Sequence, residues 1–145
     1  MKHRIDMAAG NEPADVLIVN ARVVDVFSGL VRQDAVAIGD GVFVGFGQRE
    51  AREVVDAQGA YLLPGFIDAH MHIESTMVTP FELARAIVPS GTTTIIADPH
   101  EIVNVCGLTG LQYMIKAAEN TALDIKYMMV DEFQDTNTTQ YEIII

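Results

Sequence analysis

The sequence has few of the features that mark several common classes of protein. Cys106 is the only cysteine among 145 residues, so neither an intrachain disulfide nor a cysteine-only metal site can form. No apolar run approaches the roughly 18 residues that a membrane span needs. We therefore expect a cytoplasmic protein without a membrane partner.

Basic residues are also scarce, because nine Lys and Arg stand against 20 Asp and Glu. The formal net charge of -11 at pH 7 repels the phosphate backbones of nucleic acids, and no basic cluster offsets it. We therefore expect no nucleic-acid partner.

The first part of the chain, residues 1–63, has the texture of a small β-module. Short runs rich in Val and Ile alternate with turn residues, and Asp40-Gly41 is the strongest hairpin signal. We expect His3 to lie in a frayed terminus. The pattern predicts an antiparallel β-module with strands at residues 16–19, 23–27, 35–38, 42–46 and 54–55.

Residues 64–129 alternate between strand-like and helix-like segments, which is typical of parallel βα units. The pattern predicts strands at residues 66–72, 92–97 and 124–130, and a helix at about residues 109–119. A further helix follows the capping box Thr79-Pro80-Phe81-Glu82 and ends before Gly91. The fold class is α/β, and we expect an incomplete barrel because a (β/α)8 barrel needs at least about 200 residues.

The strongest chemical signal is the pair His70 and His72 at the end of the strand at residues 66–72. Strand side chains alternate between faces, so both imidazoles point the same way and can bind one metal ion. An isolated His-x-His is more often part of a polar rim. Here three of the four histidines fall at strand ends, which favours the metal site.

Carboxylates and a third imidazole follow these strands. Asp98, His100 and Glu101 come after the second barrel strand, where they can serve as ligands, orienting groups or substrate contacts, or simply cap a loop. Glu74 is either a site carboxylate or a solvated loop residue. Cys106, with no base spaced to activate it, is predicted to be a small core residue.

Two segments of the sequence resemble the bacterial adenine deaminases. The P-G-F-I-D-x-H-x-H core at residues 64–72 is shared by many metal-dependent amidohydrolases, among them dihydroorotases and amino-sugar deacetylases. The continuation I-E-S-T-M-V-T-P at residues 73–80 and the segment D-P-H-E-I-V-N-V at residues 98–105 are more specific to the deaminases. The resemblance covers about residues 14–129 and implies an amidohydrolase-type barrel preceded by the β-module.

The resemblance also implies a function, which is hydrolytic deamination of adenine to hypoxanthine and ammonia. It implies manganese or iron as the cofactor, as one or two ions, with zinc as the alternative. On this basis His70 and His72 are predicted metal ligands, Glu74 and Glu101 candidate catalytic residues, and Asp98 and His100 candidate substrate contacts.

In such deaminases further ligands come from later barrel strands, so we expect this chain alone to be catalytically incomplete. The full-length relatives are expected to form homo-oligomers. The alternatives are another amidohydrolase, such as a cyclic amide hydrolase or a deacetylase, and a non-catalytic fusion fragment.

Residues 130–145 depart from the deaminase pattern. The string Asp131-Glu132-Phe133-Gln134-Asp135-Thr136-Asn137 resembles the Walker B segment of superfamily-one DNA helicases. That segment acts opposite a phosphate-binding loop, and no G-x-x-x-x-G-K-[ST] motif occurs in this sequence, so ATP hydrolysis is not expected. We interpret the segment as a helicase-like tail at a fusion or sequence junction, and the alternative is a solvated acidic tail.

Overall fold

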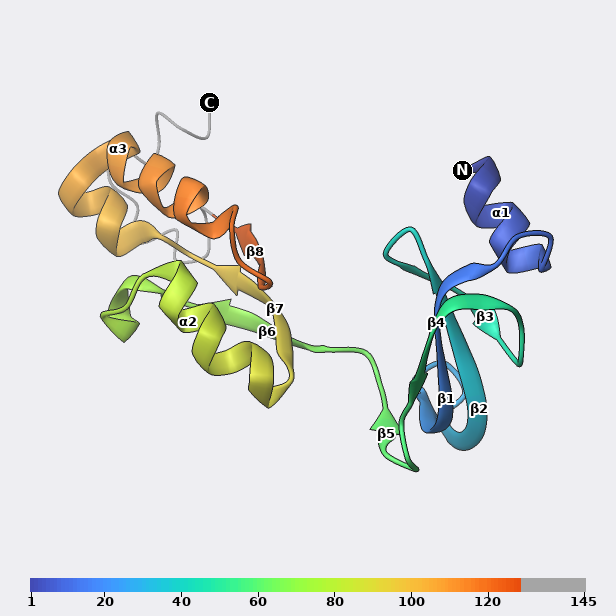
Figure 1. Cartoon of the computed structure of the whole chain (residues 1–145). Coiled ribbons are helices and arrows are strands. Elements are labelled where there is room, and N and C mark those ends of the chain that lie inside the picture. Colours follow the sequence, from blue (N-terminus) through green and yellow to red (C-terminus); the bar gives the residue numbers. More distant parts are fainter. Residues whose placement is uncertain (129–145) are drawn as a thin grey trace. The chain divides into compact units, whose positions relative to one another are not determined.

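A computed structural model describes residues 1–128, and the predicted helicase-like tail lies outside the described residues. The chain divides into two compact units, Met1–Pro64 and a second unit that begins at Gly65 (Figure 1). Among the described residues, no helix is both long and apolar enough to cross a membrane.

The first unit is built around one five-stranded sheet. Its hydrogen-bonded order is β3-β2-β1-β4, and β5 also pairs with β1. The strands are β1 (Ala14–Asp25), β2 (Leu30–Gly39), β3 (Val42–Phe46), β4 (Ala51–Asp56) and β5 (Tyr61–Leu62).

The predicted antiparallel arrangement holds for two pairings, β1 with β2 and β2 with β3. The hairpin between β2 and β3 turns at Asp40 and Gly41, whose φ angles are 51° and 71°. Positive φ at both central residues is the requirement of a tight two-residue hairpin turn, which is why Asp-Gly is a strong signal for it.

The prediction of a wholly antiparallel module was wrong, because β4 and β5 both pair with β1 in parallel. The two separate strands predicted at residues 16–19 and 23–27 are one strand, β1, with an irregularity between Ile18 and Ala21. Asn20 has a φ of 56° there, and its side chain donates a hydrogen bond of 2.9 Å to Asp56. This local irregularity lets one edge of β1 pair first with β4 and then with β5.

The N-terminus is a helix, α1 (Lys2–Ala9), so the prediction of a frayed segment around His3 was wrong. Met7 is fully buried, and the Arg49 guanidinium donates to the carbonyl oxygens of Met7 and Ala8 at 3.1 and 3.2 Å. His3 lies between two carboxylates, with Nδ1 3.2 Å from Asp40 and Nε2 3.0 Å from Glu12. These contacts hold a helix that would be too short to persist by itself.

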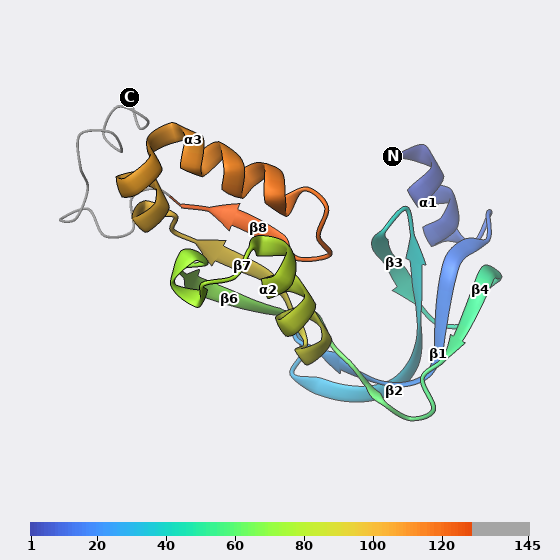
Figure 2. The same cartoon turned by 60° about the vertical axis from the view of Figure 1, so that its left-hand side comes forward.

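The second unit has a parallel three-stranded sheet in the order β6-β7-β8. Figure 2 shows the three strands side by side, with α2 and α3 as the connections between them. In chain order the elements are β6 (Phe66–Met71), η1 (Glu74–Thr76), α2 (Pro80–Ile87), η2 (Val88–Ser90), β7 (Thr92–Ala97), α3 (His100–Ala118) and β8 (Asp124–Tyr127).

Helix α2 follows the sequence prediction closely. The Thr79 hydroxyl accepts a hydrogen bond from the Glu82 backbone N–H at 3.4 Å, and Pro80 occupies the first helical position. After α2 the helix continues as the tighter 3₁₀ turn η2, which is capped at its C-terminus by Gly91 with a φ of 102°. Strand β7 then covers residues 92–97, as predicted.

The core of the second unit lies between the sheet and its two helices. Ile95 and Ala97 of β7 are buried against Leu83 and Ala84 of α2 and Met114 of α3. At the entry to the sheet, a Cβ on Gly65 would overlap the side chain of Thr93. A residue without a side chain therefore lets the start of β6 approach β7 closely.

The second predicted helix begins nine residues earlier than the sequence indicated, at His100 and not at Thr109. Gly107, with φ of 59° and ψ of -151°, interrupts it and breaks the local helical pattern. Cys106 is exposed, so the prediction that it belongs to the core was wrong. Gly110 is buried, and a Cβ there would approach Ile102 and Cys106 within 3.0 Å.

The contact between His3 and Asp40 gives a first testable prediction. Its hydrogen bond holds the pKa of Asp40 below the usual 3.8, with support from the charges of His3 and Arg4. Because this carboxyl is more acidic in the folded chain, the contact contributes stability above pH 3.8 that is lost as the pH falls below it. In His3→Ala we expect the Asp40 pKa to rise toward 3.8, measured by NMR titration of the carboxyl carbon.

Asp25 is the matched control, since its lowered pKa comes from hydrogen bonds with Ser28 and Phe27 and not from His3. An Asp40 pKa that does not move in His3→Ala would contradict the assignment.

The cap of α2 gives a second prediction. Thr79→Ala removes the acceptor for Glu82 N–H, and we expect the free energy of unfolding to fall by about 1 kcal/mol. The measurement is the urea midpoint at an unchanged m-value. Ser90→Ala, an exposed serine of η2, should change the free energy by less than about 0.5 kcal/mol. Equal effects of the two substitutions would refute the capping role.

Candidate metal centre

The candidate site forms where two neighbouring parallel strands end. His72 directly follows β6, Asp98 directly follows β7, and His100 is the first residue of α3. The Asp98 backbone N–H donates to the Met71 carbonyl at 3.0 Å, so the strand pairing continues to the edge. Because the strands are parallel, their carboxyl ends meet at one edge and deliver these side chains to the same place.

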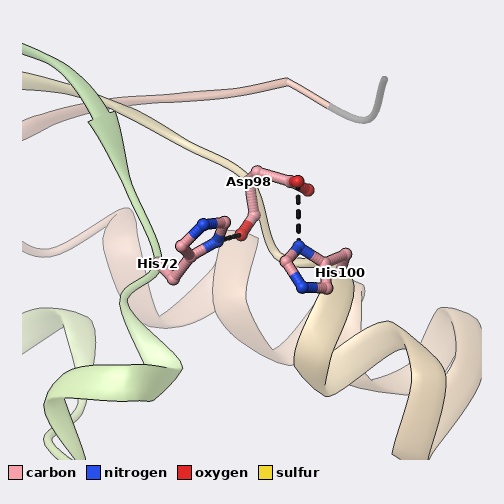
Figure 3. A group of neighbouring side chains, drawn as sticks. All are labelled: His72, Asp98 and His100. Carbon is pink, nitrogen blue, oxygen red and sulfur yellow. Dashed lines mark hydrogen bonds and ion pairs between the residues drawn. The ribbon is translucent and has the colours of Figure 1, made fainter. Parts of the chain in front are cut away.

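Asp98 connects the two imidazoles, as Figure 3 shows. Its backbone carbonyl lies 3.0 Å from His72 Nδ1, and its Oδ2 lies 2.9 Å from His100 Nδ1. The rings of His72 and His100 also meet edge to face, with centroids 4.7 Å apart. Asp98 is the one buried charged residue among those that the structure describes, whereas both histidines are half-buried.

These hydrogen bonds fix the chemistry of both rings. A carbonyl and a carboxylate only accept, so each Nδ1 carries the proton and donates it. In the neutral ring each Nε2 then offers a lone pair to a metal ion, and an imidazole oriented by a carboxylate is typical of metal centres.

His72, Asp98 and His100 lie close enough together to bind one cation. One ligand atom from each of His72, Asp98 and His100 falls within 4.8 Å of the others. Asp98 Oδ1 is buried and has no hydrogen-bond partner among residues 1–128. A buried carboxylate oxygen without a donor is costly, and a bound cation would satisfy it.

His70, the other ligand predicted from sequence, is exposed and lies beside this group. Its ring meets that of His72 edge to face, with centroids 4.8 Å apart. Its backbone N–H donates to the Asp68 carboxylate at 3.1 Å. The structure therefore brings three imidazoles into a row, and the pairing of His70 with His72 as ligands stays a prediction.

The two candidate catalytic carboxylates contact the segments around the site. Glu74 Oε1 accepts a hydrogen bond from the Ile102 backbone N–H at 3.1 Å, within the first turn of α3. Glu101 is exposed and accepts a hydrogen bond from the Ser75 hydroxyl at 2.8 Å. Both carboxylates thus join η1 to the start of α3.

Tyr127, at the end of β8, was not singled out by the sequence analysis. Its hydroxyl donates to the Met114 carbonyl at 2.9 Å, and the Glu74 carboxylate is close enough to influence its ionisation. A tyrosine at the carboxyl end of a third parallel strand shares the edge that carries the histidines. This position in the sequence could have identified Tyr127 as a residue near the site.

Both the sequence and the fold of this chain are similar to those of known proteins. A model described as "Amidohydrolase family" matches residues 61–143. Adenine deaminase 2 of Desulfotalea psychrophila is 57% identical over 129 residues, covering 89% of this chain and 22% of that protein. Adenine deaminase of Nitratidesulfovibrio vulgaris is 53% identical over 122 residues, covering 84% and 21%. The chain thus spans about a fifth of the length of these curated relatives.

Among solved structures, one of D-aminoacylase, reported for its binuclear metal center, matches with a TM-score of 0.58 and 19% identity. The match covers 80% of this chain and 29% of that one. It supports the predicted architecture of a β-module followed by βα units of a barrel.

The environment of Tyr127 gives a third prediction. Burial raises the pKa of Tyr127 to about 12, and the negative charge of Glu74 adds to the rise. Between pH 10 and 12 the folded chain keeps a proton that the unfolded chain has lost, so stability falls as the pH rises through this window. We expect Tyr127→Phe to remove the last tyrosine to ionise, measured by ultraviolet titration of tyrosinate.

Tyr113→Phe is the control, since Tyr113 is exposed on α3. Glu74→Gln should lower the Tyr127 pKa by removing the nearby charge. Loss of an early-titrating tyrosine in Tyr127→Phe would show that the phenol is not buried as described.

Proposed function

This chain belongs to the amidohydrolase family, and we propose that the protein to which it contributes is an adenine deaminase, which hydrolyses adenine to hypoxanthine and ammonia. The observation that carries the proposal is the convergence of His72, Asp98 and His100 at one strand edge. The choice of adenine as the substrate rests on two relatives named adenine deaminase, which are 57% and 53% identical to this chain.

Within this proposal, His72, Asp98 and His100 hold a divalent cation, together with His70 as the sequence predicts. The donor atoms are nitrogen and oxygen, a set that suits manganese, iron or zinc, and we assign manganese or iron. When bound, the cation supplies Lewis acidity that makes the hydrolytic water a stronger acid near neutral pH. The structure of D-aminoacylase was reported for a binuclear metal center, and this supports the proposal of a second ion here.

The side chains around the cation divide the remaining tasks. Asp98 holds the protons of the His100 ring and, through its carbonyl, of the His72 ring, so both imidazoles keep their orientation. The sequence predicts Asp98 and His100 as contacts to adenine. Either residue keeps that role if it does not bind the cation. A proton must travel from water to the amine that leaves as ammonia, and a carboxylate is suited to carry it.

Of the two predicted carboxylates, Glu101 is the exposed one and lies next to His100, so it is the better placed to meet a substrate. Glu74 is half-buried, and its carboxylate accepts a hydrogen bond from the Ile102 backbone N–H. We expect further ligands and proton carriers to come from parts that the longer relatives have and this chain does not span, since it covers 22% and 21% of two of them. We also propose that the longer protein is a cytoplasmic homo-oligomer that serves purine salvage.

The test of this function is ammonia and hypoxanthine formation from adenine by the full-length protein, reconstituted with manganese or iron. We expect His72→Ala to lower metal affinity and activity by more than the roughly 10- to 100-fold that is typical of losing a residue that only orients a ligand, because it removes a ligand itself. His3→Ala is the matched control, since that histidine lies in α1 of the other unit, and it should leave both unchanged.

Turnover of an N-acyl amino acid or a cyclic amide, with adenine left intact, would replace this function by another of the family. The 145-residue chain alone should bind metal weakly and leave adenine unchanged. Deamination by the isolated chain would show that its own residues complete the site.

A further inference from the structure

Glu74 connects the two segments that carry the central histidines. It lies in η1, two residues after His72, and its Oε1 accepts a hydrogen bond of 3.1 Å from the Ile102 backbone N–H. Ile102 is two residues after His100, in the first turn of α3. One hydrogen bond thus spans the two segments within two residues of each imidazole.

Helix α3 needs an acceptor at this point. Its N-cap is Pro99, and no side chain caps the helix locally. The first N–H groups of a helix have no partner within the helix, and the positive end of the helix dipole favours a negative charge. The Glu74 carboxylate, which is 28 residues away in the sequence, supplies both the acceptor and the charge.

The surroundings of Glu74 make this contact stronger than a surface cap. Glu74 is half-buried, its Oε2 is inaccessible to solvent and lacks a partner among the described residues, and Tyr127 lies nearby. Burial weakens the screening of its attraction to the helix terminus. Beside it, the Ser75 hydroxyl donates to exposed Glu101 at 2.8 Å, so consecutive residues of η1 hold consecutive residues of α3.

We propose that Glu74 is a positioning residue, which fixes the start of α3 and thereby sets His100 against His72 so that both are ready to bind the metal ion. This role rests on the metal centre of the proposed function and is independent of adenine as the substrate. Because Glu74 acts through the backbone of α3, shortening or removing its side chain loosens the metal centre without removing a ligand.

The test uses the full-length protein and Co²⁺ as the probe, with affinity and ligand-field absorption as readouts. We expect Glu74→Ala to weaken Co²⁺ binding by about 10- to 100-fold and to alter the spectrum, as for residues that orient metal ligands. Glu74→Gln, whose amide oxygen still accepts from Ile102, should restore the affinity to within a few-fold and return the spectrum to that of the parent. Glu74→Asp keeps the charge but not the reach, and should resemble Glu74→Ala.

Thr79→Ala is the matched structural control, because it also removes a helix cap in this unit, but the cap belongs to α2 and not to α3, the helix that begins at His100. At a comparable loss of stability it should leave Co²⁺ affinity and spectrum unchanged. Parent-like binding by both Glu74→Ala and Glu74→Asp, or an equal loss in Thr79→Ala, would overturn the positioning role. If Glu74→Ala does not fold, Glu74→Asp against Glu74→Gln decides the question.

The two proposals fail in different ways. If the parent protein binds Co²⁺ through His72 and responds to Glu74 as expected but leaves adenine intact, the positioning role stands and the substrate is wrong. If Co²⁺ binding is the same in His72→Ala as in the parent, the metal centre is elsewhere, and the positioning role is overturned.

Discussion

The parallel pairing of β6 with β7 is the constraint on which the site depends. It brings Met71 beside Ala97 and continues to the hydrogen bond between the Asp98 N–H and the Met71 carbonyl. His72 and Asp98 are 26 residues apart in the chain, and the common strand edge is what makes them neighbours. Asp98 then uses its carbonyl for one imidazole and its carboxylate for another, so a single buried residue orients two rings.

Much of the fold could be predicted from local sequence, because some signals are complete within a few residues. Asp40-Gly41 has the two positive φ angles of a tight hairpin turn, Thr79 caps α2 from the adjacent position, and the β-branched run at residues 92–97 forms β7. The direction in which β4 pairs with β1 is not encoded in either strand by itself. It depends on the chain between them, which is why the parallel arrangement was missed.

The start of α3 shows the same limit at the site itself. Sequence rules look for a cap beside the first turn, and here Pro99 provides none while Gly107 breaks the periodicity. The acceptor comes from Glu74, so the sequence rules placed the helix start nine residues late. The residues of the site were identified by type and by their position at strand ends. Sequence could not show that Asp98 contacts an imidazole ring whereas Glu74 accepts from the Ile102 backbone in α3. That distinction required the three-dimensional structure.

Gly65 has a consequence for how such a sequence can diverge. The space that its missing side chain leaves is filled by Thr93 of β7, so the two positions cannot vary independently. The Cβ of Thr93 itself would lie 2.7 Å from a Cβ at position 65, so a side chain fits at position 65 without a shift only after position 93 has become glycine, and the reverse order of substitutions passes through a clash. The two residues form an epistatic pair at the entry to the sheet, and the accessible mutational paths there depend on their order.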